Sequence, residues 1–461
     1  MKIKPAKWLF LPLEIKVREL ESKVLLSCCA AEKGFCTIIG PSGFNLNKDL
    51  PGGVYFDKSI SPNKLQFFRE QKFEFNNKIV CLDEEGLVYK KDYYIRERTS
   101  IQTIKLTDKV FCWGNDQCHL LQCEYNNEKD RFLSTGAPRV DVWASSDRQS
   151  VIDQADALKN KFGEYILFPS NFSAVNNANG DDFILRQYKS YGLINGIEEE
   201  QFLTERLSYQ KDIFEGFKAM IFDTCQEFKH INFVVRMHPG DNMTFWQSFA
   251  EKIPNLFCSY EGSLLAAIKG SILVIHNNCT SAIEGFYAHH PVIAYNPIEK
   301  DPRFEHNLPN RMSIQTYNIA DLHEKITDHI NGKLRFHRDE FIDLINNHII
   351  HHDHELASDR IAKALHSLEI ECATLCTDNY ISNEKSIFSK FKRRLITFFN
   401  IGFNLHMTRA YKRQKNPGIC ISEIECLISD YKTLYKRFGN ISVFELGKDQ
   451  FLIYPHHLVD N

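Results

Sequence analysis

The sequence predicts an α/β protein with two parallel-sheet domains and a mainly helical C-terminal extension. Short apolar runs rich in β-branched residues alternate with longer helical patterns from the first residue onward, which is typical of a parallel sheet covered by helices. The alternation pauses over a polar stretch at 142–160 and then restarts, and it ends near Arg335. We therefore expect domains over 1–145 and 160–335, and an extension over 336–461.

Each predicted strand is a short apolar run, most of them closed by Gly, Pro, Asp or Asn, and each predicted helix has an amphipathic pattern. In the first domain the strands are 8–13, 36–39, 53–56, 78–82, 110–113 and 132–134, and the helices are 19–31 and 63–75. In the second domain the strands are 165–168, 232–237, 256–259, 272–275 and 291–295, and the helices are 197–228, 244–252, 263–269, 281–288 and 320–332. Two such domains, joined once, are expected to face a cleft at the carboxyl ends of both sheets.

The composition narrows the class of protein. Of 461 residues, 43% are hydrophobic and 25% charged, ordinary values for a globular protein. The 56 basic and 59 acidic residues give a net charge of −3, which does not favour nucleic acid as a partner. The 14 cysteines include no CxxC pair, which favours reduced thiols and a cytoplasmic location. The N-terminal apolar stretch is interrupted by Pro12 and Glu14 and is too short for a signal-peptide core or a membrane span.

The positive charge is concentrated in one segment, 386–415. It holds eight Lys or Arg residues and no acidic residue, and phenylalanines are interleaved with the basic residues. A basic helix with an aromatic face is typical of contact with an anionic membrane surface. The alternative is a helix that packs its phenylalanines on the domains while its lysines stay in water. Both interpretations stay open.

An acidic turn, Asp83-Glu84-Glu85-Gly86, directly follows a predicted strand. Adjacent carboxylates repel one another, so we expect the pKa of at least one to be raised, which suits a general base acting on a hydroxyl. Gly86 allows the backbone to turn tightly and approach a ligand. The alternative is a solvated acidic turn.

A histidine follows a strand of the second domain, in the sequence Arg236-Met237-His238-Pro239. Pro239 fixes the chain direction there. An imidazole at this place can donate to a phosphate or protonate a leaving group near neutral pH. The alternative is a core histidine held by backbone partners.

A third candidate is the turn after the strand at 272–275, where the helix at 281–288 opens with Thr280 and Ser281. Free amides and hydroxyls at a helix start can hold a phosphate. Ser281 and Glu284 also have the spacing of a capping box, and the two interpretations are compatible. Asn171, after the first strand of this domain, is expected to lie at the edge of the cleft.

Other motifs are absent or weak. The sequence contains neither GxGxxG nor GxxxxGK(S/T), so it has neither the dinucleotide-binding fingerprint nor a P-loop. A histidine-rich stretch at 348–354 could bind metal, but it lies beyond the α/β repeats, and we predict no functional metal and no cofactor.

The order of these motifs resembles that of bacterial sialyltransferases and Kdo transferases, and more closely that of bacterial surface carbohydrate biosynthesis proteins. The matching phrases lie between about residues 5 and 330 and are 53–59, 82–88, 113–114, 135–141, 171–172, 236–239, 279–285 and 291–297. The resemblance implies the GT-B fold of two Rossmann-like domains, and a metal-independent transfer of an acidic sugar from a CMP-activated donor.

By the same resemblance, Glu85 would contact or deprotonate the acceptor hydroxyl, with Glu84 beside it and Asp83 and Gly86 completing the turn. His238 would face the CMP phosphate and assist its departure, while Thr280 and Ser281 would hydrogen-bond that phosphate. The remaining residues assigned to the phosphate side are Arg236, Pro239 and Glu284.

One departure concerns stereochemistry. Related retaining Kdo transferases place a nucleophilic aspartate after the first strand of the second domain, but here 169–177 has no carboxylate before Asp181 and Asp182. Either a different residue acts as the nucleophile, or the reaction inverts the configuration of the transferred sugar, or the donor is a different one.

The expected function is therefore a glycosyltransferase of surface polysaccharide, lipopolysaccharide or capsule synthesis, with a glycan or lipid-linked acceptor. The alternatives are a UDP-sugar epimerase-like or glycerophosphotransferase-like enzyme, and a non-catalytic scaffold of glycan assembly.

Overall fold

The structure is a computed structural model that describes residues 1–44, 49–194, 196–305, 308–352, 354–378, 380–381 and 409–459. It divides into two compact units. Unit 1 comprises Met1–Val142, Ile345–Leu405 and Asn416–Asn461, and unit 2 comprises Trp143–Leu344 and His406–Lys415.

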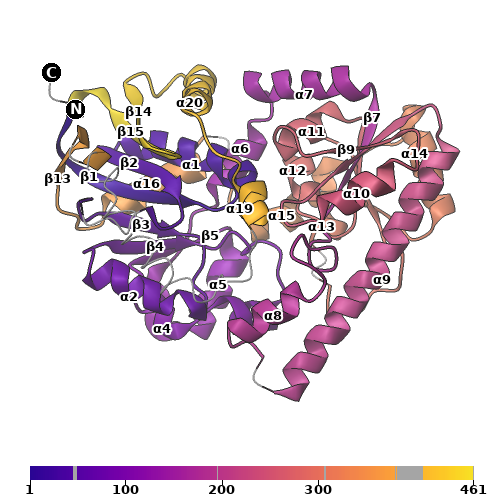
Figure 1. The fold of residues 1–461 in the computed structure, drawn as a ribbon, viewed down its shortest axis with the longest axis horizontal. Coiled ribbons are helices and arrows are strands. Elements are labelled where there is room, and N and C mark those ends of the chain that lie inside the picture. Colours follow the sequence, from indigo (N-terminus) through magenta and orange to yellow (C-terminus); the bar gives the residue numbers. More distant parts are fainter. Residues whose placement is uncertain are drawn as a thin grey trace. The chain divides into compact units, whose positions relative to one another are not determined.

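Unit 1 is built on a nine-stranded sheet (Figure 1) in the order β14-β15-β2-β1-β3-β4-β5-β6, with β13 paired to β1. Its strands are β1 (Lys2–Leu13), β2 (Phe35–Pro41), β3 (Val54–Asp57), β4 (Lys78–Leu82), β5 (Lys109–Cys112), β6 (Phe132–Ser134), β13 (Ala373–Cys376), β14 (Ile441–Gly447) and β15 (Gln450–Pro455). From β2 to β6 the strands run parallel, as the strand–helix alternation predicts.

Strand β1 has two parts with different partners. Its first part pairs antiparallel with β13, and its second part, from Lys7 onward, pairs parallel with β2. The indole Nε1 of Trp8 donates to the carbonyl of Ala373 at 2.9 Å. The strand is therefore longer than the apolar run that predicts it, because its polar first residues find a partner far along the chain.

The described residues of the C-terminal part are mainly helical, as predicted, but this part is not separate from the two units. It supplies β13, β14 and β15 to the sheet of unit 1, and α19 to unit 2. The hairpin β14–β15 covers the edge of β2 in antiparallel register, which satisfies hydrogen-bonding groups that an open edge would expose. The three strands are not in the prediction for this region.

The helices of unit 1 cover both faces of its sheet. They are α1 (Lys16–Ala31), α2 (Leu65–Phe73), α3 (Lys91–Tyr93), α4 (Ile101–Ile104), α5 (Asn115–Glu124), α16 (Ala357–His366) and α20 (Ile421–Tyr435), while α6 (Pro138–Ala144) and α15 (Ile342–His348) span unit boundaries. The buried carboxylate of Asp141 accepts from the amides of Ala357 and Ser358, both at 2.9 Å, and so caps α16.

Unit 2 contains a six-stranded parallel sheet in the order β12-β11-β10-β7-β8-β9. Its strands are β7 (Tyr165–Pro169), β8 (Asn232–Arg236), β9 (Leu256–Ser259), β10 (Leu273–His276), β11 (Val292–Tyr295) and β12 (Ile314–Thr316). The middle strands β7 and β10 are buried along their whole length, as expected for strands covered by helices on both faces.

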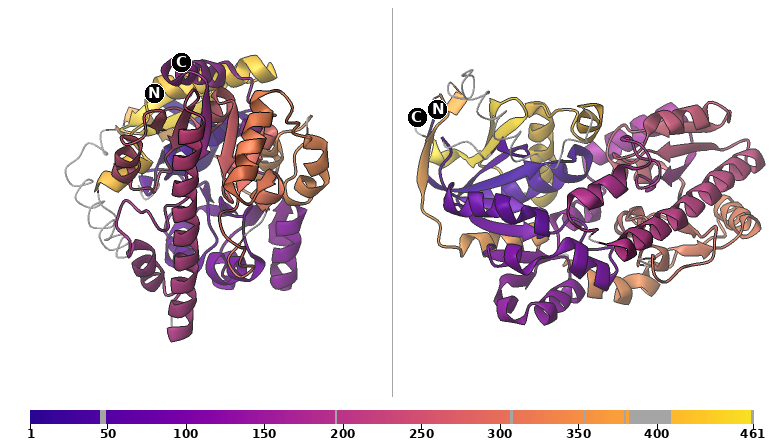
Figure 2. Two further views of the ribbon diagram at one scale, coloured as in Figure 1. Left: turned by 90° about the vertical axis from the view of Figure 1, so that its right-hand side faces the viewer. Right: turned by 60° about the horizontal axis from the view of Figure 1, so that its bottom comes forward.

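The helices of unit 2 are α7 (Gln149–Phe162), α8 (Phe183–Ser190), α9 (Ile197–Glu227), α10 (Met243–Ala250), α11 (Leu264–Gly270), α12 (Ser281–Tyr287), α13 (Leu308–Arg311), α14 (Ile319–Ile330) and α19 (Arg409–Lys415). The long helix α9 (Figure 2) buries Phe214 and Phe217 in the core of this unit. Of the described helices, none combines the length and hydropathy needed to cross a membrane.

The predicted fold class is confirmed: the chain is a mixed α/β protein with parallel sheets. The predicted bounds of β4, β6 and β9 agree with the structure, and most other elements differ by one or two residues. The cleft between the two predicted domains stays a prediction.

Candidate functional site

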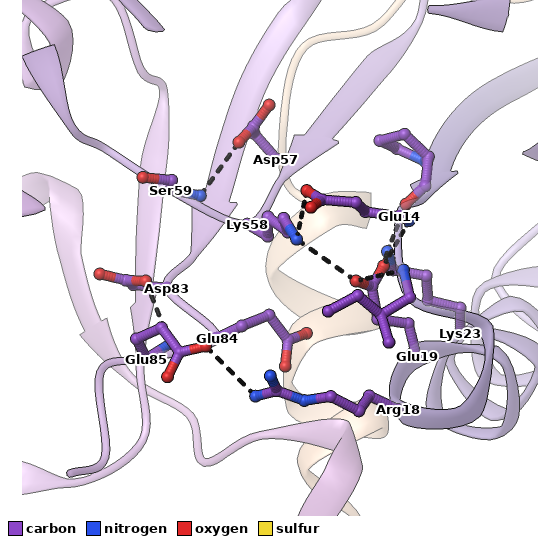
Figure 3. A network of polar contacts seen from close by, with 12 residues as sticks. Glu14, Arg18, Glu19, Lys23, Asp57, Lys58, Ser59, Asp83, Glu84 and Glu85 are labelled. Atoms are coloured by element: carbon purple, nitrogen blue, oxygen red, sulfur yellow. Dashed lines mark hydrogen bonds and ion pairs between the residues drawn. The ribbon is translucent and has the colours of Figure 1, made fainter. Parts of the chain in front are cut away.

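In unit 1, each carboxylate of the acidic turn after β4 is paired with an arginine from elsewhere in the unit. Arg18 of α1 donates to Glu85 at 3.2 Å (Figure 3), and Arg139 donates to Glu84 at 3.3 Å. Arg98 forms an ion pair with Asp83. The three cations come from positions 67, 55 and 15 residues away in the chain, and they offset the repulsion between the carboxylates.

At Glu85 this pairing has the opposite effect to the raised pKa that we expected for at least one of the three carboxylates. The charge of Arg18, with smaller effects of Arg98 and Arg139, outweighs the partial desolvation of the Glu85 carboxylate and lowers its pKa to about 2. The prediction of a raised carboxyl pKa is therefore wrong for Glu85, because it considered the acidic neighbours and not the arginines. Glu85 is ionised at neutral pH, and its side chain is 54% exposed, so it can accept a hydrogen bond from a ligand.

A second charged cluster lies next to the turn, on the segment that joins β1 to α1, on α1 itself and on the loop after β3 (Figure 3). Lys58 contacts Glu14 at 2.7 Å and Glu19 at 3.4 Å, and Lys23 contacts Glu19 at 2.6 Å. Glu19 is buried, which disfavours its charged form, but Lys23 and Lys58 together lower its pKa to about 2. The carboxylate also accepts from the amides of Glu14 and Ile15. Glu19 therefore orders the start of α1.

Asp83 and Gly86 have structural neighbours within the fold. Asp83 is 1% exposed, its carbonyl accepts from the indole of Trp113 at 2.7 Å, and its carboxylate accepts from the amide of Glu85 at 3.1 Å. A Cβ on Gly86 would lie 2.2 Å from Nε2 of Gln117. Gly86 is required for close packing against Gln117, and Asp83 holds the turn that presents Glu84 and Glu85.

In unit 2, the turn after β8 fixes the tautomer of His238. The amide of Gly240 donates to Nδ1 of His238 at 3.0 Å, so the proton of the neutral ring is on Nε2. The amide of His238 donates to the carboxylate of Asp241 at 3.0 Å, which also accepts from the indole of Trp246. Nε2 of His238 is thus a hydrogen-bond donor held at the carboxyl edge of the sheet.

Arg236 directs its guanidinium inward. It is 5% exposed, and its two terminal nitrogens donate to the carbonyls of Glu261 and Gly262. Burial lowers its pKa to about 10, although Tyr260 and the buried Glu284 favour the charged form. Arg236 therefore supports the loop that joins β9 to α11, and Glu284 lies near enough to influence its charge.

The turn after β10 has a strained backbone and a fixed imidazole. Asn278 has φ of 45°, a left-handed conformation that asparagine tolerates better than most residues. His276 is fully buried, accepts at Nδ1 from the amide of Cys279 at 3.2 Å, and contacts Ser313 through Nε2 at 2.9 Å. Burial lowers the pKa of His276 to about 3, so the ring is neutral.

The expected capping box at Ser281 and Glu284 is absent. Thr280, not Ser281, is the N-cap of α12, and no side chain caps this helix. The hydroxyl of Ser281 is buried, with no hydrogen-bond partner among the described residues. The hydroxyl of Ser281 therefore makes no hydrogen bond at the helix start, and a ligand that binds this hydroxyl breaks none there.

Several more polar atoms along the same edge are buried without a partner in the described part of the chain. They follow β7 and β10, which are neighbours in the sheet, and they are Oδ1 of Asn171, Nδ2 of Asn176 and Oδ1 of Asn278. The hydroxyl of Ser170, also after β7, interacts with the carboxylate of Asp241 after β8. The other side of the Asn171 amide donates to the carbonyl of Asn277 at 2.7 Å, which joins two of these loops. Buried polar atoms without partners are costly, so this edge has unused donors and acceptors for a polar ligand.

The described residues contain no group of three His, Cys, Asp or Glu side chains that could hold a metal ion. Of the histidine-rich stretch 348–354, Asp353 lies outside the described residues. His348 pairs with Asp116 at 3.4 Å.

No family model matches this chain, and no curated protein matches it. Solved structures with similar folds include UDP-GlcNAc 2-epimerase from Methanocaldococcus jannaschii, with 14% identity, a TM-score of 0.47, and coverage of 78% of this chain and 99% of that one. The Neisseria meningitidis epimerase has 10% identity, a TM-score of 0.47, and coverage of 78% and 99%. The wall teichoic acid polymerase TagF has 11% identity, a TM-score of 0.43, and coverage of 79% and 89%. Similarity at this level does not assign an activity.

Sequence reasoning missed the residues that complete both sites. Arg139 lies within the phrase 135–141 that carries the resemblance, but nothing marked it as the partner of Glu84. Arg18 and Arg98 have no local signal, because their carboxylate partners are distant in the chain. Ser170 and Asn278 adjoin residues that were singled out, and their place directly after a strand was the available signal.

Proposed function

We propose that this protein is a glycosyltransferase of bacterial surface polysaccharide synthesis, which transfers an acidic sugar from a CMP-activated donor to a glycan or lipid-linked acceptor. The observation that carries the proposal is the row of buried hydroxyl and amide groups after β7 and β10 that have no hydrogen-bond partner in the described part of the chain. The CMP donor follows from the motif resemblance to sialyltransferases and Kdo transferases.

The donor nucleotide binds to unit 2 in this proposal. Nε2 of His238 and the hydroxyls of Thr280 and Ser281 donate to its phosphate, and they stabilise the charge that develops there as the sugar leaves. The unpartnered acceptor oxygens of Asn171 and Asn278 suit the hydroxyl or amino groups of a nucleoside. Pro239 shapes the turn, and Arg236 and Glu284 support the sheet edge from within.

The acceptor binds to unit 1 in this proposal. Glu85 is ionised and exposed, and Arg18 orients it, so it accepts a hydrogen bond from an acceptor hydroxyl and positions that hydroxyl. A carboxylate with a pKa of about 2 is a weak base, which favours orientation of the acceptor over removal of its proton. Glu84, held by Arg139, lies beside it in the turn.

A thermal-shift titration with CMP, CDP, UDP and GDP tests the donor class. We expect CMP to raise the melting temperature selectively, and the effect to be lost in His238→Ala and in the double variant Thr280→Ala/Ser281→Ala. A preference for UDP would support an epimerase-like enzyme, and no response to any nucleotide would support a non-catalytic scaffold.

Peripheral contact with the inner face of the cytoplasmic membrane through 386–415 also stays a proposal. Most of this segment lies outside the described residues, which resume at Arg409. Vesicle co-sedimentation with and without anionic lipid tests it, because a basic segment should bind only the anionic vesicles.

A further inference from the structure

Helix α19 of the C-terminal region packs on the turn that carries His238. The side-chain amide nitrogen of Gln414 donates to the carbonyl of Pro239 at 3.0 Å and to that of Asp241 at 2.9 Å. Because both partners are acceptors, the orientation of the Gln414 amide is determined. One side chain therefore holds both ends of the segment Pro239-Gly240-Asp241.

Other contacts fix α19 in this place within unit 2. The hydroxyl of Tyr260 donates to the carbonyl of Gln414 at 2.9 Å. Tyr411 is 5% exposed and packs against Phe183, with ring centroids 6.0 Å apart. Gln414 is thus supplied by a helix that is anchored on two sides.

The clamped turn is the one that sets the state of His238. Gly240, between the two carbonyls that Gln414 holds, donates to Nδ1 of His238. A Cβ on Gly240 would lie 2.9 Å from Cβ of Ser173 and 3.3 Å from Nδ1 of His238, so the turn has little room to move toward the ring. Displacement of the turn would weaken the bond that places the ring proton on Nε2.

We propose that Gln414 is a positioning residue for His238: by clamping the Pro239–Asp241 turn, it holds the imidazole with Nε2 as the donor toward the nucleotide phosphate. This inference rests on the proposed function for the ligand. The part that concerns the tautomer stands on the hydrogen bonds alone.

The test uses the full chain with Gln414→Glu, which keeps the size of the side chain but removes both N–H donors and places a charge against two carbonyl oxygens. Lys412→Ala is the matched control, because Lys412 is on the same helix and exposed. Long-range ¹H–¹⁵N spectra report the tautomer of each imidazole, and the His238 signals are assigned by their loss in His238→Gln.

In Gln414→Glu we expect the His238 signals to move toward a mixture of tautomers and the Kd for CMP, measured by calorimetry, to rise about tenfold, while the melting temperature stays close to that of Lys412→Ala. Unchanged His238 signals in a folded Gln414→Glu protein would overturn the inference. If the wild type binds no CMP, the proposed donor is wrong, and the imidazole spectra still decide the role of Gln414. If Gln414→Glu fails to fold, Gln414→Met, which is neutral and of similar volume, provides the same comparison.

Discussion

The carboxyl edges of the two sheets differ in how they satisfy their polar groups. In unit 1, Glu19, Asp83, Glu84 and Glu85 each have a cationic partner. In unit 2 the corresponding edge is lined mainly by hydroxyls and amides, and four of its buried polar atoms, in Asn171, Asn176, Asn278 and Ser281, have no partner among the described residues. The comparison shows that the charged groups of unit 1 satisfy one another, whereas the edge of unit 2 keeps unused donors and acceptors for a polar ligand.

The largest effect should come from breaking a buried pair in unit 1. Glu19→Ala leaves Lys23 buried without its main partner, so we expect the free energy of unfolding to fall by about 3–5 kcal/mol. Urea denaturation followed by circular dichroism measures it. A loss under 1 kcal/mol would mean that Lys23 reaches water in the variant and that the charges of unit 1 are not interdependent.

The two units should also respond differently to acid. For His276 the folded pKa of about 3 lies below the usual value near 6.5. Between pH 6.5 and pH 3 this histidine is protonated in the unfolded state and neutral in the folded state. The stability that the neutral ring contributes is therefore lost as pH falls through this range. For Glu19 the folded pKa of about 2 places the corresponding loss below pH 4.5.

A comparison of wild type with a variant that lacks one titrating group separates the effect of that group from the effects of others that titrate in the same pH range. Asp241, whose pKa burial raises to about 6, acts in the opposite sense, because its protonation in the folded state adds stability as pH falls from 6 toward 4. We expect the stability difference between wild type and His276→Asn to change by roughly 1.4 kcal/mol per pH unit between 6 and 4. A difference that does not depend on pH would show that His276 is protonated in the folded state.

A smaller effect distinguishes two serines at helix starts in unit 2. The hydroxyl of Ser263 caps α11 by accepting from the amide of Ala266 at 3.1 Å, so Ser263→Ala should cost about 1 kcal/mol. Ser281 has no such bond, so Ser281→Ala should leave stability unchanged or raise it by up to about 1–3 kcal/mol, while CMP binding weakens. Thermal denaturation with and without CMP separates the two. Equal destabilisation by both variants would argue that Ser281 is structural.

The smallest expected change in stability belongs to Glu85→Gln. Its side chain is 54% exposed, so water screens the ion pair with Arg18, and the loss of this pair should cost about 0–1 kcal/mol. Transfer to the acceptor should nevertheless fall at least tenfold, with an unchanged Kd for CMP. A variant that transfers sugar at the wild-type rate would remove Glu85 from the proposed acceptor site.

The sequence predicts the parallel sheets well because their strands are buried on both faces and read as apolar runs. It predicts less of the C-terminal third, where β13 is short and partly exposed. The hairpin β14–β15 carried a signal, two apolar runs around the turn at Gly447–Asp449, that the helical interpretation overlooked. The candidate site residues were chosen because they follow predicted strands, and their roles stay a prediction. The partner of Glu85, Arg18, and the partner of the His238 turn, Gln414, could not be predicted. Each is distant in the sequence and comes close only when the chain is folded.

The hairpin at the edge of β2 has a consequence for the order of folding during synthesis. Unit 2, apart from α19, is complete once Leu344 has been made, whereas the sheet of unit 1 waits for β13 and for β15 at Gln450–Pro455. At about 5–20 residues per second, the edge of β2 stays open for roughly 20–80 seconds after this strand has been made. During that interval the nascent chain exposes a pairing surface to its neighbours. We therefore expect changes that delay or weaken the hairpin β14–β15 to increase the need for chaperones, although the strand left exposed, β2, lies near the N-terminus.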